Sequence, residues 1–183
     1  MKSALRMVGV PVLVCLGVAV VGALAGCTGL QPINERSDWG PGLRFSETAS
    51  SYDWSAHGKQ TSGEGRPLNP SVDPLIREAI EKQLAEKGYQ KAVAGTPDFW
   101  IDYRMMRDRR GDPDFSGAGI GMMETGSLAV YVFDPASEKL IWRGYMEAKL
   151  DESATPDVMK KRLDDAVRRI MKPIPPCKNK NKK

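Results

Sequence analysis

Few side chains in this sequence could cooperate in catalysis. His57 is the only histidine, and it stands in a polar stretch rich in glycine. A histidine-centred triad, or a zinc site built on several histidines, is therefore hard to assemble. Residues 107–114 place three aspartates among three arginines, but the twelve-residue spacing of a calcium-binding hand is absent. We expect a solvated loop of mixed charge here, no metal site, no cofactor and no enzymatic activity.

The clearest chemistry belongs to a thiol near the start of the chain. A basic start precedes residues 7–25, which carry no charge, and the run ends in the letters LAGC at residues 24–27. This layout is typical of an export signal with small residues before the cleaved bond. The final four residues resemble the lipobox of bacterial lipoproteins. The resemblance implies that residues 1–26 are a cleaved signal peptide and that Cys27 is lipidated with palmitate or similar acyl chains, enough for firm anchoring.

An uncleaved transmembrane helix is the alternative for the same stretch, because about twenty apolar residues can span a bilayer. Pro11, several glycines and the terminal cysteine argue against it. Thr28 follows Cys27 at a position where aspartate would favour inner-membrane retention in enterobacterial lipoproteins. The expected location is therefore the periplasmic side of the outer membrane, with the inner membrane less favoured.

Length and charge indicate one folded domain that does not bind nucleic acid. Residues 27–183 suit a single core. The formal net charge of +4 includes the cleaved basic start and four lysines near the C-terminus, so the folded body is slightly acidic. Nucleic-acid binders instead cluster basic residues on a folded face. Cys177 remains as a lone thiol; we expect it unpaired in a tail, with an intermolecular link as the alternative.

Hydrophobic periodicity predicts six elements after a mobile tether. Residues 27–42, rich in glycine and proline, are expected to form the lipidated N-terminus and that tether. Apolar spacings of three and four indicate helices, and alternation of period two indicates strands. The predicted helices are residues 73–88 and 155–172, and the predicted strands are residues 43–54, 98–106, 127–134 and 139–150.

The apolar faces of these elements define the expected core. The first helix is expected to begin with Asp73 as its cap and to end at Gly88. Its buried residues are predicted to be Ile76, Ala79, Ile80 and Leu84, and those of the last helix Met159, Leu163, Ala166, Val167 and Ile170. In the strand at 127–134, Leu128, Val130 and Val132 face one side, while Tyr131 and Phe133 face the other.

The order of the elements predicts an α+β two-layer sandwich. Its sheet would be antiparallel, of about four strands, with two amphipathic helices packed on one face. The single domain would span residues 43–173, and residues 174–183 would be a disordered basic tail.

The segment between the second and third predicted strands is a candidate partner-binding loop. Its glycine run at 117–121 does not fit a dinucleotide-binding loop, because a strand, not a helix, follows it. A connection of about twenty residues is longer than a hairpin needs, and such loops are often functional; the alternative is a plain flexible connection. The apolar residues that could contact a partner are Phe115, Ile120, Met122 and Met123.

Three tryptophans could form a ligand platform if they shared an exposed face. They are Trp54, Trp100 and Trp142. Strand tryptophans at this spacing are more often core residues, and we expect Trp142 to be one.

Several short motifs together resemble a family of small bacterial lipoproteins built on domain of unknown function 4136. The similarity covers about residues 43–173, and its motifs are Tyr52-Asp53-Trp54, Asn69-Pro70, Lys87-Gly88-Tyr89, Pro97-Asp98-Phe99, Gly126-Ser127-Leu128 and Leu140-Ile141-Trp142-Arg143-Gly144. The resemblance implies a lipid-anchored periplasmic domain of mixed helix and sheet. It implies no established activity and supplies no catalytic residues.

These observations favour a non-enzymatic binding or scaffolding domain, held to a membrane by its N-terminal lipid. Its expected partner is another envelope protein or the cell wall. The alternative is an accessory subunit of an envelope assembly or transport complex. A hydrolase would need distant acids to meet, for example Asp102 and Glu147 on neighbouring strands.

Overall fold

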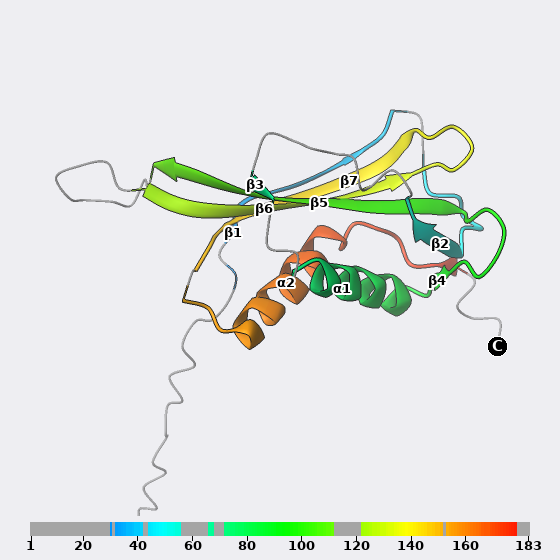
Figure 1. The fold of residues 1–183 in the computed structure, drawn as a ribbon. Coiled ribbons are helices and arrows are strands. Elements are labelled where there is room, and N and C mark those ends of the chain that lie inside the picture. Colours follow the sequence, from blue (N-terminus) through cyan, green and yellow to red (C-terminus); the bar gives the residue numbers. More distant parts are fainter. Residues whose placement is uncertain are drawn as a thin grey trace, which may run out of the picture.

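The computed structural model describes residues 30, 32–41, 44–55, 66–67, 72–111, 122–151 and 153–178. The predicted signal peptide, residues 1–26, and Cys27 lie outside these residues. The described chain forms two layers, a long sheet and two helices that lie beneath it in Figure 1. In chain order the elements are β1 (Pro32–Trp39), β2 (Ser51–Trp54), β3 (Arg66–Pro67), α1 (Asp73–Glu86), β4 (Gln90–Lys91), β5 (Phe99–Gly111), β6 (Met122–Phe133), β7 (Leu140–Lys149) and α2 (Pro156–Ile170).

The α+β class is confirmed, but the sheet is mixed and larger than the four antiparallel strands predicted. Six strands follow the order β1-β7-β6-β5-β2-β4, and the two-residue β3 also pairs with β5. Neighbours from β1 to β5 run antiparallel, whereas β2 runs parallel to both β5 and β4. The parallel pairs arise because α1 carries the chain from β2 back along the sheet, so the next strand starts from the same end.

The predicted tether is wrong for half of its length. Residues 32–39 form the edge strand β1, which pairs with β7 from Pro32 opposite Ala148 to Trp39 opposite Trp142. All eight residues of β1 are exposed, so the strand is held by backbone pairing and has no apolar alternation to reveal it. Leu30, just before it, packs against the core.

The predicted strand at 43–54 is confirmed only in its last four residues, β2. The residues before it include a turn at 47–48 and the buried Ala49. The carboxylate of Asp98 accepts hydrogen bonds from the backbone N–H groups of Ser50 and Ser51, at 2.9 and 2.8 Å. These bonds join the start of β2 to the start of β5.

Both helices pack their predicted apolar faces on the sheet, with two corrections. The cap of α1 is Val72 and not Asp73, which is already helical and bonds other side chains, while Gly88 ends the turn with a φ of 92°. Thr155 caps α2 by accepting a hydrogen bond from the N–H of Val158. Met159 is 38% exposed and not buried, because the buried face of α2 begins one turn later.

The two strands of the long hairpin run further than predicted. β5 continues to Gly111 and β6 begins at Met122, with these two residues opposite each other. Arg107 and Glu124 form an ion pair of 2.7 Å across the extension. Charged residues facing each other can hold a solvated ribbon together without apolar alternation, which is why the pattern of apolar residues ends earlier than the strands.

The predicted disordered tail is wrong for its first residues. Ile174 and Cys177 are buried. The N–H of Cys177 donates to the carbonyl of Lys87 at 2.8 Å, and the hydroxyl of Tyr89 donates to the carbonyl of Pro175 at 2.9 Å. Three prolines rule out a helix here, but an extended segment can still bury side chains and supply carbonyls. Residues 179–183 lie outside the described chain.

Candidate binding face

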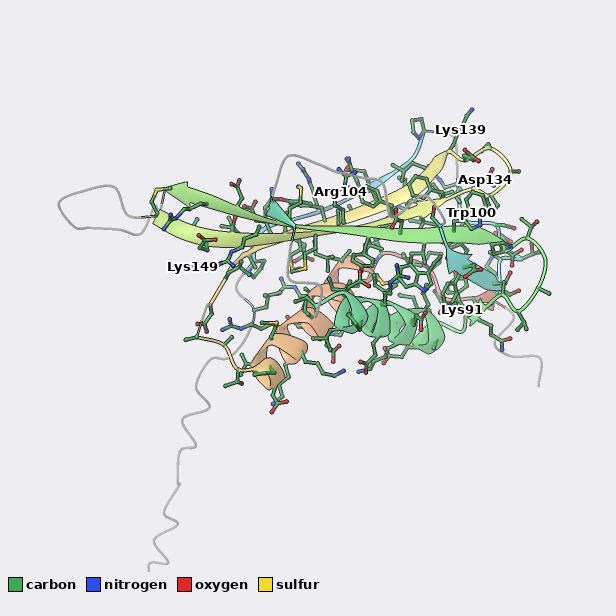
Figure 2. The ribbon with its side chains drawn as sticks, in the orientation of Figure 1. Lys91, Trp100, Arg104, Asp134, Lys139 and Lys149 are labelled. Carbon is green, nitrogen blue, oxygen red and sulfur yellow. The ribbon has the colours of Figure 1, made fainter. Side chains whose placement is uncertain are left out.

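One face of the sheet carries no helix within the described chain, and we call it the open face. Both helices pack against the opposite face, where Phe99, Ile101, Val130, Val132 and Trp142 are buried. In Figure 2, Trp100 and Arg104 stand on the side of the sheet away from the helices. By alternation and register the open face includes Arg36, Asp38, Trp100, Asp102, Arg104, Ala129, Tyr131, Phe133, Arg143, Tyr145 and Glu147.

Three aromatic side chains lie next to one another on the open face. Trp100 is directly opposite Phe133, and the rings of Tyr131 and Phe133 stack with centroids 6.2 Å apart and planes 18° apart. All three are partly exposed. Neighbouring aromatics that stay partly exposed on a sheet offer a rigid apolar surface for contact.

Charged groups surround these aromatics. Arg143, opposite Tyr131, forms an ion pair of 2.8 Å with Asp38, and the guanidinium of Arg36 lies 4.8 Å from the ring centroid of Tyr145. The Nε atom of Arg104 is buried and has no hydrogen-bond partner among the described residues. The face thus combines cations, hydrogen-bond donors and flat rings.

Two carboxyl groups on this face are partly or almost fully buried. Burial raises the pKa of Asp102, against the opposing effects of the Tyr103 N–H and the nearby Arg77 and Arg104. Glu147 is almost fully buried and accepts a hydrogen bond of 3.3 Å from the hydroxyl of Tyr145. These two acids could have formed the hydrolytic pair considered above, but β6 separates their strands, and the register puts them roughly 16 Å apart.

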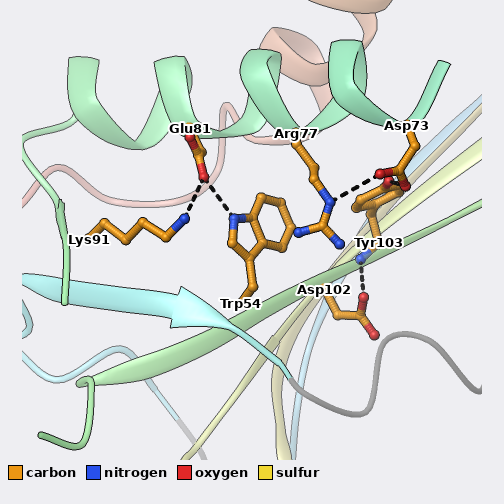
Figure 3. A network of polar contacts seen from close by, with 7 residues as sticks. All are labelled: Trp54, Asp73, Arg77, Glu81, Lys91, Asp102 and Tyr103. Atoms are coloured by element: carbon orange, nitrogen blue, oxygen red, sulfur yellow. Dashed lines mark hydrogen bonds and ion pairs between the residues drawn. The ribbon is translucent and has the colours of Figure 1, made fainter. Parts of the chain in front are cut away.

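A second polar cluster joins α1 to the edge of the sheet, and Figure 3 shows it. The guanidinium of Arg77 lies over the rings of Trp54 and Tyr103, at 4.4 and 5.8 Å from their centroids. Glu81 accepts hydrogen bonds from the indole of Trp54 at 2.8 Å and from Lys91 at 3.1 Å. We call these residues, together with Asp73, the edge cluster.

The chemistry of the edge cluster fits attachment of the helix. Tyr103 donates a hydrogen bond to Asp73, and both burial and this carboxylate raise the pKa of its phenol. A phenol that stays protonated is a steady donor. Every member of the cluster uses its polar group on another member, so the cluster fixes α1 to the short strand β2.

The predicted site residues lie in different parts of the molecule. Trp142 is a core residue as predicted, Trp100 belongs to the open face, and Trp54 belongs to the edge cluster. Met122 and Met123 are in β6 and not in a loop, and their role in partner binding stays a prediction. Phe115, Ile120 and Cys27 lie outside the described chain. The described residues contain no group of three potential metal ligands.

The sequence alone does not predict the open face as a site, although part of its signal is present in the alternation of the strands. Tyr131 and Phe133 were placed opposite the buried Leu and Val residues of their strand. Arg143 alternates with buried residues in the same way. The alternation within one strand does not show that a neighbouring strand places Trp100 beside Tyr131 and Phe133.

The fold defines a class, a mixed α+β sandwich with one helical layer. The family model for domain of unknown function DUF4136 matches residues 36–176. The chain belongs to the DUF4136 family. No curated protein matches it. No helix in the part of the chain described is both long and apolar enough to span a membrane.

Solved structures resemble this fold loosely. A PDZ domain protein from Parabacteroides distasonis has 16% identity and a TM-score of 0.46, over 78% of this chain and 37% of that one. The PelC dodecamer of Paraburkholderia phytofirmans has 9% identity and a TM-score of 0.46, over 75% of this chain and 94% of that one. A DUF330 protein from Xanthomonas campestris has 12% identity and a TM-score of 0.35, over 76% and 87% of the two chains. At these values the similarity says nothing about activity.

Proposed function

We propose that this protein is a lipid-anchored envelope protein whose domain binds a partner protein through its open face and catalyses no reaction. The observation that carries the proposal is the group of partly exposed aromatics Trp100, Tyr131 and Phe133, flanked by Arg104 and Arg143. Tryptophan, tyrosine, phenylalanine and arginine are the residues enriched in protein interfaces and their hot spots. The lipid on Cys27 and the periplasmic location are parts of the same proposal and rest on the resemblance of residues 24–27 to a lipobox.

The size of the open face suits a transient partner. Four strands at ~4.8 Å spacing and about six residues at ~3.3 Å give a patch of roughly 14 Å by 18 Å, about a third of the ~800 Å² that each partner buries in a standard interface. Anchoring both partners to one membrane raises their effective concentration and offsets the small area. A lipid anchor and a small aromatic face therefore fit together.

An accessory subunit of an envelope assembly is the second candidate, and β1 favours it. The outer edge of this eight-residue strand has no strand partner in the described chain. An open edge can accept a strand from another subunit, although charged residues such as Glu35 and Arg36 normally discourage that pairing. A stable complex that co-purifies through β1 would identify this role.

The test is crosslinking of the intact lipoprotein in cells, followed by mass spectrometry of captured proteins. The double variant Trp100→Ala with Tyr131→Ala should lose most of a recurrent envelope partner. Trp39→Ala is the matched control, because Trp39 is also a partly exposed strand tryptophan but faces Trp142 on the helical side. Equal capture by both variants, or no recurrent partner at all, would overturn binding through the open face.

A further inference from the structure

The domain begins very close to the proposed lipid. Leu30 packs against the hydrophobic core, so only Thr28 and Gly29 separate the folded domain from Cys27. Three residue steps span at most about 11 Å. If Cys27 carries acyl chains in a leaflet, as the proposed function states, the domain cannot stand far from the headgroups.

The direction of β1 decides which end of the domain faces the membrane. Pro32, its first residue, pairs with Ala148 near the end of β7. The start of β6 and the end of β5 lie at this same end of the sheet, as the register shows and as Figure 1 lets the reader follow. The loop that holds Val93 lies at the other end, about 40 Å away along the thirteen residues of β5. We call the end of the sheet that holds Pro32, Gly111 and Met122 the anchor end.

Exposed apolar side chains lie at the anchor end on separate elements, and by register Ile33 and Met122 are roughly 17 Å apart. Of the five large exposed apolar residues in the described chain, three belong to it: Ile33 in β1 at 47%, Met122 in β6 at 50% and Met159 in the first turn of α2 at 38%. Within the domain nothing described covers them. Apolar groups next to a lipid attachment point can enter the interface between headgroups and acyl chains.

The charges on the hairpin at this end are partly balanced. Arg107 and Arg109 both pair with Glu124, at 2.7 and 3.5 Å, so their charges are partly balanced within the hairpin. Contact with a leaflet would therefore depend on the apolar side chains and on the short tether.

We propose that the anchor end docks on the surface of the membrane that holds the lipid, with Ile33 and Met122 in the interfacial region. The lipid and the protein surface then act as two linked contacts, and the second orients the domain. The opposite end, with Val93, points away from the leaflet.

Depth measurements on the lipidated protein in vesicles of phosphatidylethanolamine and phosphatidylglycerol test this orientation. Nitroxide labels are placed at Ile33→Cys, Met122→Cys and, as the control, Val93→Cys, in a Cys177→Ser background. Labels at the first two sites should be shielded severalfold from a water-soluble relaxation agent and accessible to oxygen, relative to the label at the third. Equal exposure of all three labels to the aqueous agent would overturn docking.

The mass of the N-terminal peptide, measured on the same samples, separates the two proposals. An acylated Cys27 with equally exposed labels means that the anchor exists and the docking does not. An unmodified Cys27 removes the proposed anchor and the docking with it.

A second measurement needs no reporter substitutions in the domain. Met122 of the vesicle-bound protein should be oxidised by hydrogen peroxide severalfold more slowly than Met122 of a water-soluble form produced without residues 1–27. The buried Met146 should react slowly in both forms and serves as the internal control. Equal rates for Met122 in the two forms would contradict the proposal.

Discussion

The guanidinium carbon of Arg77 lies 4.4 Å from the ring centroid of Trp54, and the same indole donates a hydrogen bond to Glu81 one turn further along α1. Two helical residues thus hold one strand tryptophan by its face and by its edge. Because β2 has only four residues, this contact adds a side-chain link to the helix to the backbone pairing of β2 with β4 and β5.

Replacing Arg77 with methionine should lower the free energy of unfolding by about 1 kcal/mol, since the apolar stem stays while the cation–π contact and the bond to Asp73 are lost. Chemical denaturation measures the change. Lys82→Met is the control on the same helix, because the nearest partner of Lys82 is Asp164 at 4.0 Å; we expect a change below ~0.5 kcal/mol there. Equal midpoints for the two variants would argue against a role of Arg77 in holding the edge.

Leu163→Asp should unfold or strongly destabilise the domain, by about 3 kcal/mol or more, because it buries an unpaired charge on the face of α2 that contacts the core. Met159→Asp, one turn earlier and 38% exposed, should change the melting temperature little. Both variants introduce an aspartate into the same helix, so the two sites differ mainly in how deeply they are buried. A small effect at Leu163 would show that this face is not packed in solution.

Removing residues 174–183 should cost about 3 kcal/mol or more, whereas removing residues 179–183 should cost almost nothing. The longer deletion loses the buried side chains of Ile174 and Cys177. It also loses the carbonyl that accepts from Tyr89. Thermal unfolding of both truncated proteins measures the difference, and equal stability would restore the view of a disordered tail from residue 174 onward.

Two aspartates should give stability opposite dependences on pH. Hydrogen bonds from Ser50 and Ser51 outweigh burial and hold the pKa of Asp98 below its usual value, so its contribution is present above that value and is lost as the pH falls. Burial raises the pKa of Asp102, so its contribution is greatest in acid and falls as the pH rises through the raised pKa.

The asparagine variants separate these two effects. Asp98→Asn should therefore destabilise at neutral pH and much less in acid. Asp102→Asn should be as stable as the parent or more stable at neutral pH, with the difference shrinking in acid. Unfolding curves from pH 3 to pH 7 test both, and parallel curves for the two variants would contradict the assignments.

The core was predictable because buried apolar residues recur along the sequence at the spacing of a helix or a strand. Residues such as Ile80, Val130 and Val167 recur at the spacing of their helix or strand, and each is fully buried. Trp142 was predicted as core for the same reason. Alternation also predicts that Tyr131 and Phe133 lie on the opposite side of the strand. It does not predict that Trp100 lies next to them, because local periodicity carries no information about the order of the strands in the sheet.

Elements held by backbone pairing or by charge were not predictable in the same way. β1 exposes all its residues, and the extension of β5 and β6 is joined by Arg107 and Glu124. The parallel pairing of β2 depends on a crossover through α1. Ile174 and Cys177 are buried from an irregular segment, which has no period to detect.

If residues 1–26 are cleaved and Cys27 is acylated, as proposed, the short stretch of chain before Leu30 has a consequence for the order of maturation. Enzymes that cleave and acylate a precursor must reach the bond before Cys27 in an extended segment, and a docked domain about 11 Å away would obstruct them. β1 is the edge strand with every residue exposed, so it is the element that can detach with the least loss of packing. We expect it to join the sheet last, after lipidation. Hydrogen exchange that is much faster in β1 than in β6 would show this detachable strand, and equal protection would mean that processing precedes folding altogether.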